Sequence, residues 1–110
     1  MVWTIEQIAE LLKQHRDDTG VDFRYRVWNT EPAGDQFIAY IEMAELSVAA
    51  DNINYFDFAE FAVELYSKRL RSLTAERQLE SRLKQAGIFY RKNPPEWISD
   101  EEVYVTTYYI

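Results

Sequence analysis

Apolar side chains recur at helical spacing near the start of the chain. Ile5, Ile8, Ala9 and Leu12 form one stripe at intervals of three and four residues, which predicts a helix over residues 5–18. Thr4 with Gln7 three positions later is the signature of a capping box at the beginning of a helix. Gly20 is then expected to end the helix, because glycine readily adopts the left-handed conformation found there.

Three later stretches have the pattern of β-strands. Val21–Asn29 alternates between apolar and polar positions and predicts a half-buried strand. Gln36–Met43 is apolar on both faces for most of its length, so we expect a strand that is covered on both sides. Glu102–Ile110 is rich in β-branched and aromatic residues and predicts a third strand. Ala44–Tyr55 has no periodicity and is interpreted as a long connection.

Residues 58–67 fit both periodicities. A helix places Phe58, Phe61, Ala62, Leu65 and Tyr66 on one face, with Asp57 and Glu60 as a cap pair. A strand instead places Ala59, Phe61, Val63 and Leu65 on one face. The local rules taken alone favour the helix.

A second helix is predicted over about residues 74–86. Thr74 can cap it, Leu79, Leu83 and Ala86 form its apolar stripe, and Gly87 ends it. Glu76, Glu80, Arg77 and Lys84 are expected on its exposed sides. Ile88–Tyr90 would lead into another strand, and Asn93-Pro94-Pro95 would break the chain. The pattern indicates one α+β domain over residues 1–110.

Composition limits the chemistry that the chain can perform. The sequence has no cysteine, which excludes disulfides and zinc–thiolate sites. It has no apolar run of 18 residues, and the beginning of the chain lacks the basic region of a signal peptide. Aromatic residues make up 15% of the chain, enough for a core and for contacts with partners.

Charge is distributed unevenly along the chain. The net charge is −9 over residues 1–67, +6 over residues 68–92 and −4 over residues 93–110. Unlike regions of two copies could attract each other, although scattered charges on solvated surfaces also explain the pattern. The basic segment raises nucleic-acid binding as a third interpretation, which the overall net charge of −7 disfavours.

No combination of residues points to catalysis. His15 is the only histidine, and we expect a surface or capping role for it late in the first helix. The acidic clusters Asp17-Asp18 and Asp100-Glu101-Glu102 lack the spacing of a calcium-binding loop. We therefore predict no catalytic residue, no metal, no cofactor and no enzymatic activity.

Four segments together resemble a known family. They are Ala50–Asn52, Val63–Lys68, Leu79–Tyr90 and Glu96–Tyr104. They are similar to segments of the tail terminators of siphophages and prophages, also called tail-to-head joining or tail completion proteins. The likeness covers roughly residues 36–110, and the sequence differs from many members in Pro94-Pro95 and in its acidic, alanine-rich segment 42–50.

The resemblance implies a fold and a role. Val63–Lys68 would be a strand, giving the order α-β-β-β-α-β-β with an antiparallel sheet of four or five strands and the second helix packed on it. Members form rings, typically hexamers, on the tail tube. The partners would be further copies of the chain, the tube protein and the head connector or head-closure protein, in virions assembled in the host cytoplasm. DNA would pass through the ring without sequence-specific binding, and no membrane would be involved.

Candidate residues follow from this role. The predicted core residues are Phe61, Val63, Leu65, Leu79 and Leu83; the candidate subunit-interface residues are Arg77, Arg82, Lys84, Arg91 and Trp97; the candidate channel-lining acids are Glu60, Glu64, Asp51 and Asp57. An acidic lining would repel DNA phosphates rather than hold them. Two alternatives stay open: a head–tail neck connector or head-closure protein, and a small acidic phage inhibitor of a host DNA-binding enzyme.

Overall fold

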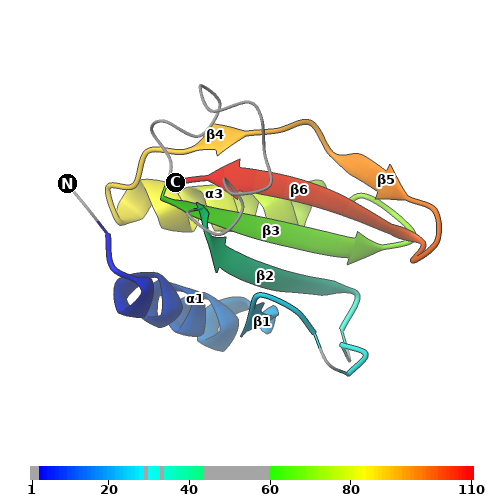
Figure 1. Ribbon diagram of the computed structural model, residues 1–110, viewed down its shortest axis with the longest axis horizontal. Coiled ribbons are helices and arrows are strands. Elements are labelled where there is room, and N and C mark those ends of the chain that lie inside the picture. The colour runs from blue at the N-terminus through cyan, green and yellow to red at the C-terminus, as the bar shows by residue number, and fades with distance from the viewer. Residues whose placement is uncertain (1–2, 29, 33, 44–59) are drawn as a thin grey trace.

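The computed structural model describes residues 3–28, 30–32, 34–43 and 60–110. Among these described residues, two helices and six strands follow the predicted order α-β-β-β-α-β-β, with the last edge of the sheet in two pieces (Figure 1). The sheet has the order β1-β2-β3-β6-β4, and β5 also pairs with β6. The elements are α1 (Ile5–Thr19), β1 (Asp22–Tyr25), β2 (Gln36–Glu42), β3 (Phe61–Lys68), α3 (Leu73–Gln85), β4 (Arg91–Lys92), β5 (Glu96–Ile98) and β6 (Val103–Tyr109).

The sheet corrects two details of the prediction. It is mixed, because β1 and β2 run parallel, whereas the other pairs are antiparallel. The chain leaves β1 through Arg26 in a left-handed conformation (φ 69°) and returns along residues 26–35 to begin β2 beside Asp22. The sheet also has six strands rather than four or five. Pro94 and Pro95, which have no N–H group for a ladder, separate β4 from β5.

The first helix begins and ends as predicted. The Gln7 N–H donates to Thr4 Oγ1 at 3.2 Å, and the Gln7 side chain accepts from the Thr4 N–H at 2.9 Å. Gly20 is left-handed (φ 82°), and its N–H donates to the Arg16 carbonyl. The capping box is confirmed, and the helix extends one residue past the predicted end.

Residues 61–68 form a strand, as the resemblance implied and against the local preference for a helix. β3 lies at the centre of the sheet, between β2 and β6, so its backbone groups are hydrogen-bonded on both sides. Phe61, Val63 and Leu65 belong to the main hydrophobic core. Pairing with two strands outweighs a weak local propensity, which explains the outcome. Residues 58 and 59 and the proposed cap Asp57 lie outside the described residues.

Both helices pack against one face of the sheet. Leu12 of α1 and Leu79 and Leu83 of α3 share one core cluster with Val63 and Tyr108 of the strands. Leu79 and Leu83 are completely buried. The alternate positions of the strands, among them Phe37, Ala39, Glu64, Tyr66 and Val105, lie on the opposite face.

The second helix begins one position earlier than predicted. Its N-cap is Ser72, whose Oγ accepts from the Ala75 N–H at 3.1 Å, and Thr74 lies inside the first turn. Gly87 (φ 76°) turns the chain away after Gln85, in agreement with the prediction. α3 therefore spans the molecule from the end of β3 to the start of β4 (Figure 1).

Candidate interaction surfaces

Three exposed apolar side chains belong to segments that lie at the end of the molecule where β3 finishes. Leu70 is 76% exposed, Leu73 is 49% exposed and Trp97 is 44% exposed. The connection from β3 to α3 contacts the turn from β5 to β6, because the Arg69 N–H donates to the Glu102 carbonyl at 2.8 Å. We call Leu70, Leu73 and Trp97 the Leu70 surface.

The Leu70 surface is firmly supported. Trp97 lies across from Tyr104 on β6, and the two rings are 4.9 Å apart. Ser67 Oγ donates to the Leu70 carbonyl at 2.6 Å, which ties the exposed loop to the end of β3. Large apolar groups presented on a well-ordered backbone are typical of protein-binding surfaces.

A second exposed apolar group lies at the other end of α3. Gly87 turns the chain, Ile88 enters the core at 4% exposure, and the next side chain, Phe89, is 95% exposed. The Ile88 N–H donates to the Leu83 carbonyl at 2.9 Å, so the corner is attached to the helix. We call residues 86–90 the Phe89 corner.

A buried carboxylate connects these two ends. Glu76 is 2% exposed and receives hydrogen bonds from Arg71 Nε and Nη2 at 2.8 and 3.0 Å. Lys92 Nζ lies 2.8 Å from Glu76 Oε1 and 2.8 Å from Glu80 Oε2. Arg71 directly follows Leu70, and Lys92 is in β4 just after the Phe89 corner. The same carboxylate therefore anchors the segments that carry both apolar surfaces.

The electrostatics of this network follow from burial and hydrogen bonding. Burial alone would raise the pKa of Glu76, but hydrogen bonds from Arg71 and Lys92 outweigh it and hold the pKa below the ordinary range. Burial alone would also raise the pKa of Glu80, but the hydrogen bonds from Lys92 and Tyr108 outweigh it and lower the pKa. Burial raises the pKa of Tyr108, whose hydroxyl donates to Glu80 at 2.7 Å. The hydrogen bonds of the network therefore favour the charged forms of Glu76 and Glu80.

The expected exposure of Glu76 was wrong, and a signal in the sequence could have shown this. Glu76, Leu79 and Leu83 are spaced by three and four residues, so the carboxylate shares the apolar stripe of the helix. An acid on such a stripe requires a cationic partner. Arg71 comes from the connection just before α3, and Lys92 is brought to the carboxylate by β4.

His15 is also placed differently from the expectation. It is 1% exposed, on the side of α1 that contacts Arg82 of α3, instead of on the surface. Arg82 Nε donates to His15 Nδ1 at 3.4 Å, and Arg82 Nη2 forms an ion pair with Asp18. Burial, and after it the Arg82 charge, lowers the pKa of His15, with Asp18 acting in the opposite direction. The spacing of Ile8, Leu12 and His15 on one helical stripe was the available signal.

The candidate interface residues fall into two groups. Arg77, Lys84 and Arg91 are exposed, and Trp97 belongs to the Leu70 surface. Arg82 is partly buried in its contacts with His15 and Asp18 and lines a shallow groove with Arg77. A role in a subunit contact stays a prediction for all five.

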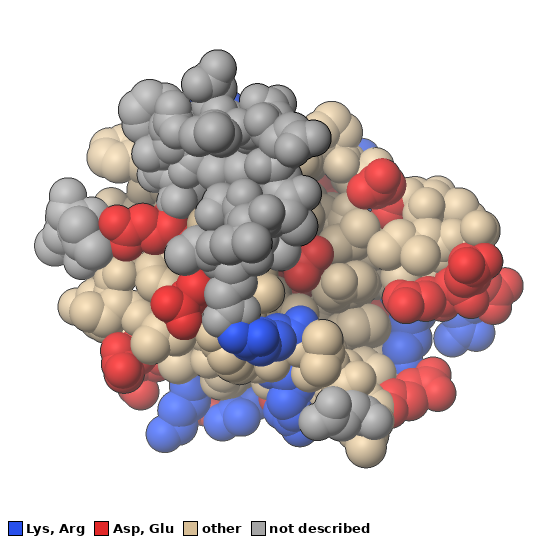
Figure 2. All heavy atoms as spheres, in the orientation of Figure 1, with Lys and Arg blue, Asp and Glu red and all other residues tan. Residues whose placement is uncertain are grey.

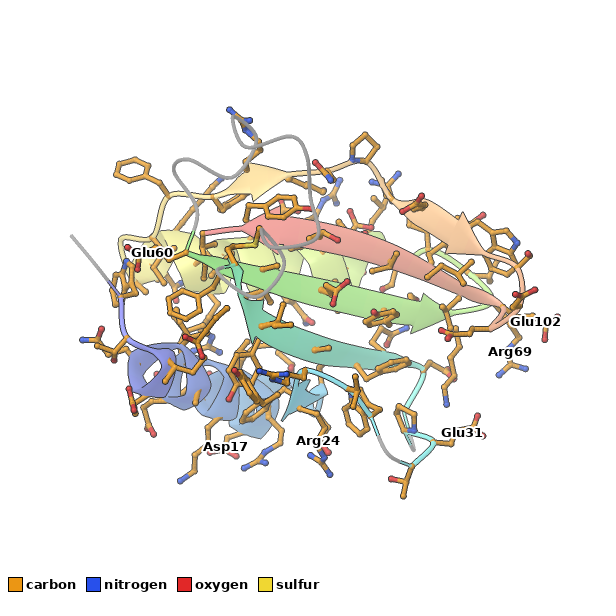
Figure 3. All side chains as sticks on the ribbon, in the orientation of Figure 1. Asp17, Arg24, Glu31, Glu60, Arg69 and Glu102 are labelled. Carbon is orange, nitrogen blue, oxygen red and sulfur yellow. The ribbon has the colours of Figure 1, made fainter. Side chains whose placement is uncertain are left out.

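The candidate channel acids are not brought together in the described structure. Glu60 is exposed at the start of β3, at the opposite end of the sheet from Glu102 (Figure 3). Glu64 is half-buried on the sheet face opposite the helices, where burial raises its pKa although the hydrogen bond with Tyr66 acts in the other direction. Asp51 and Asp57 lie outside the described residues.

None of the described side chains form a group of three or more histidines or acids that could hold a metal ion. Among the described helices, none is both long enough and apolar enough to cross a membrane.

No family model matches the chain, no curated protein matches it, and no solved structure matches it.

Proposed function

We propose that this chain is a structural protein of a bacteriophage tail, which caps the tail tube as a ring, ends tube polymerisation and joins the tail to the head connector. The observation that carries the proposal is the central strand β3 with α3 packed on it. Local rules favoured a helix over these residues, whereas the resemblance to tail terminators required a strand. The resemblance therefore anticipated a feature that the local pattern did not.

The surfaces of the molecule are consistent with assembly into a ring. A closed ring needs a heterologous interface, in which one patch meets a different patch on the next copy. The Phe89 corner and the Leu70 surface are two unlike apolar patches at opposite ends of α3. Exposed aromatic and large apolar side chains are the kind of group that anchors protein interfaces.

Two measurements test the proposal: the mass of the assembly that the purified chain forms, and the length of tail tubes grown in its presence. Light scattering and negative-stain microscopy of the purified chain, alone and with a cognate tail-tube protein, should show rings or capped tubes of limited length. A chain that stays monomeric at every concentration and leaves tube length unchanged would overturn the proposal. A neck connector built on the same fold would form rings that bind the head connector without limiting tube length.

A further inference from the structure

We propose that the Phe89 corner of one copy docks on the Leu70 surface of the next copy, so that subunits join head to tail through the two ends of α3. The biological setting of this contact rests on the function proposed above, but the contact itself can be tested on the purified chain.

Phe89 is exposed in the way expected of an interface anchor. At 95%, the Phe89 side chain is almost entirely in water, although its neighbour Ile88 is buried. Aromatic anchors of this kind dominate the binding energy of interfaces when they enter an apolar site on the partner. Leu70 and Leu73, with Trp97, offer apolar side chains of the appropriate size at the opposite end.

The two surfaces lie at opposite ends of α3, which suits a head-to-tail contact. α3 has 13 residues, so about 20 Å separates the two surfaces at 1.5 Å per residue. Figure 1 shows the β3–α3 connection and the α3–β4 connection at opposite ends of the molecule. If Phe89 contacted Phe89 of a second copy, the assembly would close as a dimer and leave both Leu70 surfaces in water. A contact between the unlike ends uses both surfaces of every copy and can close a ring.

The charged residues near the two surfaces differ in sign. Lys84 and Arg91 are exposed on either side of the Phe89 corner along the chain. Asp100, Glu101 and Glu102 are three consecutive exposed acids that follow β5 and its Trp97. Figure 2 shows acidic side chains at this end of the molecule, with basic side chains beside them. Opposite charges around an apolar centre favour one orientation of the two copies.

Both surfaces are held in place by contacts within the chain. Glu76 holds the segment after Leu70 through Arg71 and the segment after Phe89 through Lys92. Trp97 packs on Tyr104. Surfaces that are ordered before binding lose less conformational entropy when they associate.

Two complementary variants test the contact. Phe89→Ser removes the projecting group and keeps the receiving surface, whereas Leu70→Ser with Leu73→Ser removes the receiving surface and keeps the projecting group. Each variant alone should remain monomeric by analytical ultracentrifugation under conditions in which the wild type assembles. Their equimolar mixture should form one-to-one dimers and nothing larger, because only one productive contact remains.

Val27→Ser provides the matched control, since Val27 is 64% exposed but belongs to neither surface. It should assemble as the wild type does, and circular dichroism should show that all variants are folded. Assembly of Phe89→Ser at wild-type level, a mixture that stays monomeric, or an equal loss with Val27→Ser would overturn the contact.

The outcome separates this inference from the proposed function. If the wild type and Phe89→Ser form rings or cap tubes equally well, the contact is wrong and the proposed function stands. If the wild type neither assembles alone nor limits tube length, both are wrong.

Discussion

Arg69 and Glu102 are joined by a backbone hydrogen bond, and both have a left-handed conformation. The Arg69 N–H donates to the Glu102 carbonyl at 2.8 Å, with φ 66° at Arg69 and φ 54° at Glu102. Figure 3 places both residues at the end of the sheet where β3 finishes and β6 begins. Left-handed backbone costs a residue with a side chain about 1–2 kcal/mol, so the fold accepts strain here to close the loop beneath Leu70.

Glycine at either of these positions should stabilise the protein. Glu102→Gly removes the steric strain, although glycine gives the unfolded chain more freedom, so we expect a net gain of about 0.5–1 kcal/mol in the free energy of unfolding. Urea denaturation measures the change. Glu101→Gly, one position earlier and without a positive φ, is the control and should give no gain; a loss of stability with Glu102→Gly would contradict the assignment.

Loss of the buried carboxylate should destabilise the fold. Glu76→Gln removes the charge that Arg71 and Lys92 share, and we expect a loss of about 1.5–3 kcal/mol, the usual contribution of a hydrogen bond to a charged group. Thermal and urea unfolding measure it. Gln78→Ala, at an exposed position on the same helix, should change stability by less than about 0.5 kcal/mol. Equal effects of the two substitutions would show that Glu76 is not an anchor.

The pH dependence of stability should have a component from His15. Its pKa is lowered in the folded protein by burial and by Arg82, so below about pH 6.5 the unfolded chain binds a proton that the folded chain does not. The free energy of unfolding should therefore fall as the pH decreases from about 7 toward 5. His15→Gln should reduce this slope, whatever its effect on stability at pH 7.5. An unchanged slope would mean that His15 is not the group responsible.

A separate loss of stability is expected at lower pH. The pKa values of Glu76 and Glu80 are lowered in the folded state, so their stabilisation is complete above the ordinary value of 4.5 and is lost as the pH falls below it. Glu76→Gln should weaken the acid transition while leaving the His15 component in place. Unfolding curves collected between pH 2.5 and 7.5 distinguish the two.

The core of α3 should depend on Leu79 rather than on the leucine at its beginning. Leu79→Ala leaves a cavity under β3 and should cost about 2–5 kcal/mol. Leu73→Ala, on the same helix but 49% exposed, should cost far less in stability. Similar losses would mean that α3 does not pack on the sheet through this stripe.

Much of the fold could be predicted because its signals are local. The Thr4–Gln7 capping box, the stop at Gly20 and the stripe of Leu79 and Leu83 each occupy a single turn or a single face, and each is present in the structure. The parallel pairing of β1 with β2 had no such signal, because it depends on the path of residues 26–35. The state of residues 61–68 was ambiguous because both periodicities fit it, and the neighbouring strands decide the outcome.

The interaction surfaces were harder to predict than the fold. Trp97 was identified as a candidate, but Phe89 was interpreted as part of a strand, and nothing local distinguishes its exposure from the burial of Ile88. Residues 68–92, with a net charge of +6, were considered together as one basic segment. In the fold it divides, because Arg71, Arg82 and Lys92 bind acids of the same chain, whereas Arg77 and Lys84 are on the surface.

The interrupted edge of the sheet has a consequence for how copies can associate. From Lys92 to Glu96 the edge advances four residues while β6 advances three, from Tyr108 to Val105, so a bulge separates β4 from β5. Pro94 and Pro95 remove two backbone donors at this point. An additional strand cannot extend the hydrogen-bond ladder past it, which hinders crowded copies from fusing into fibrils along this edge. Copies that meet at this edge therefore associate through side-chain contacts of limited area and not by adding strands to the sheet.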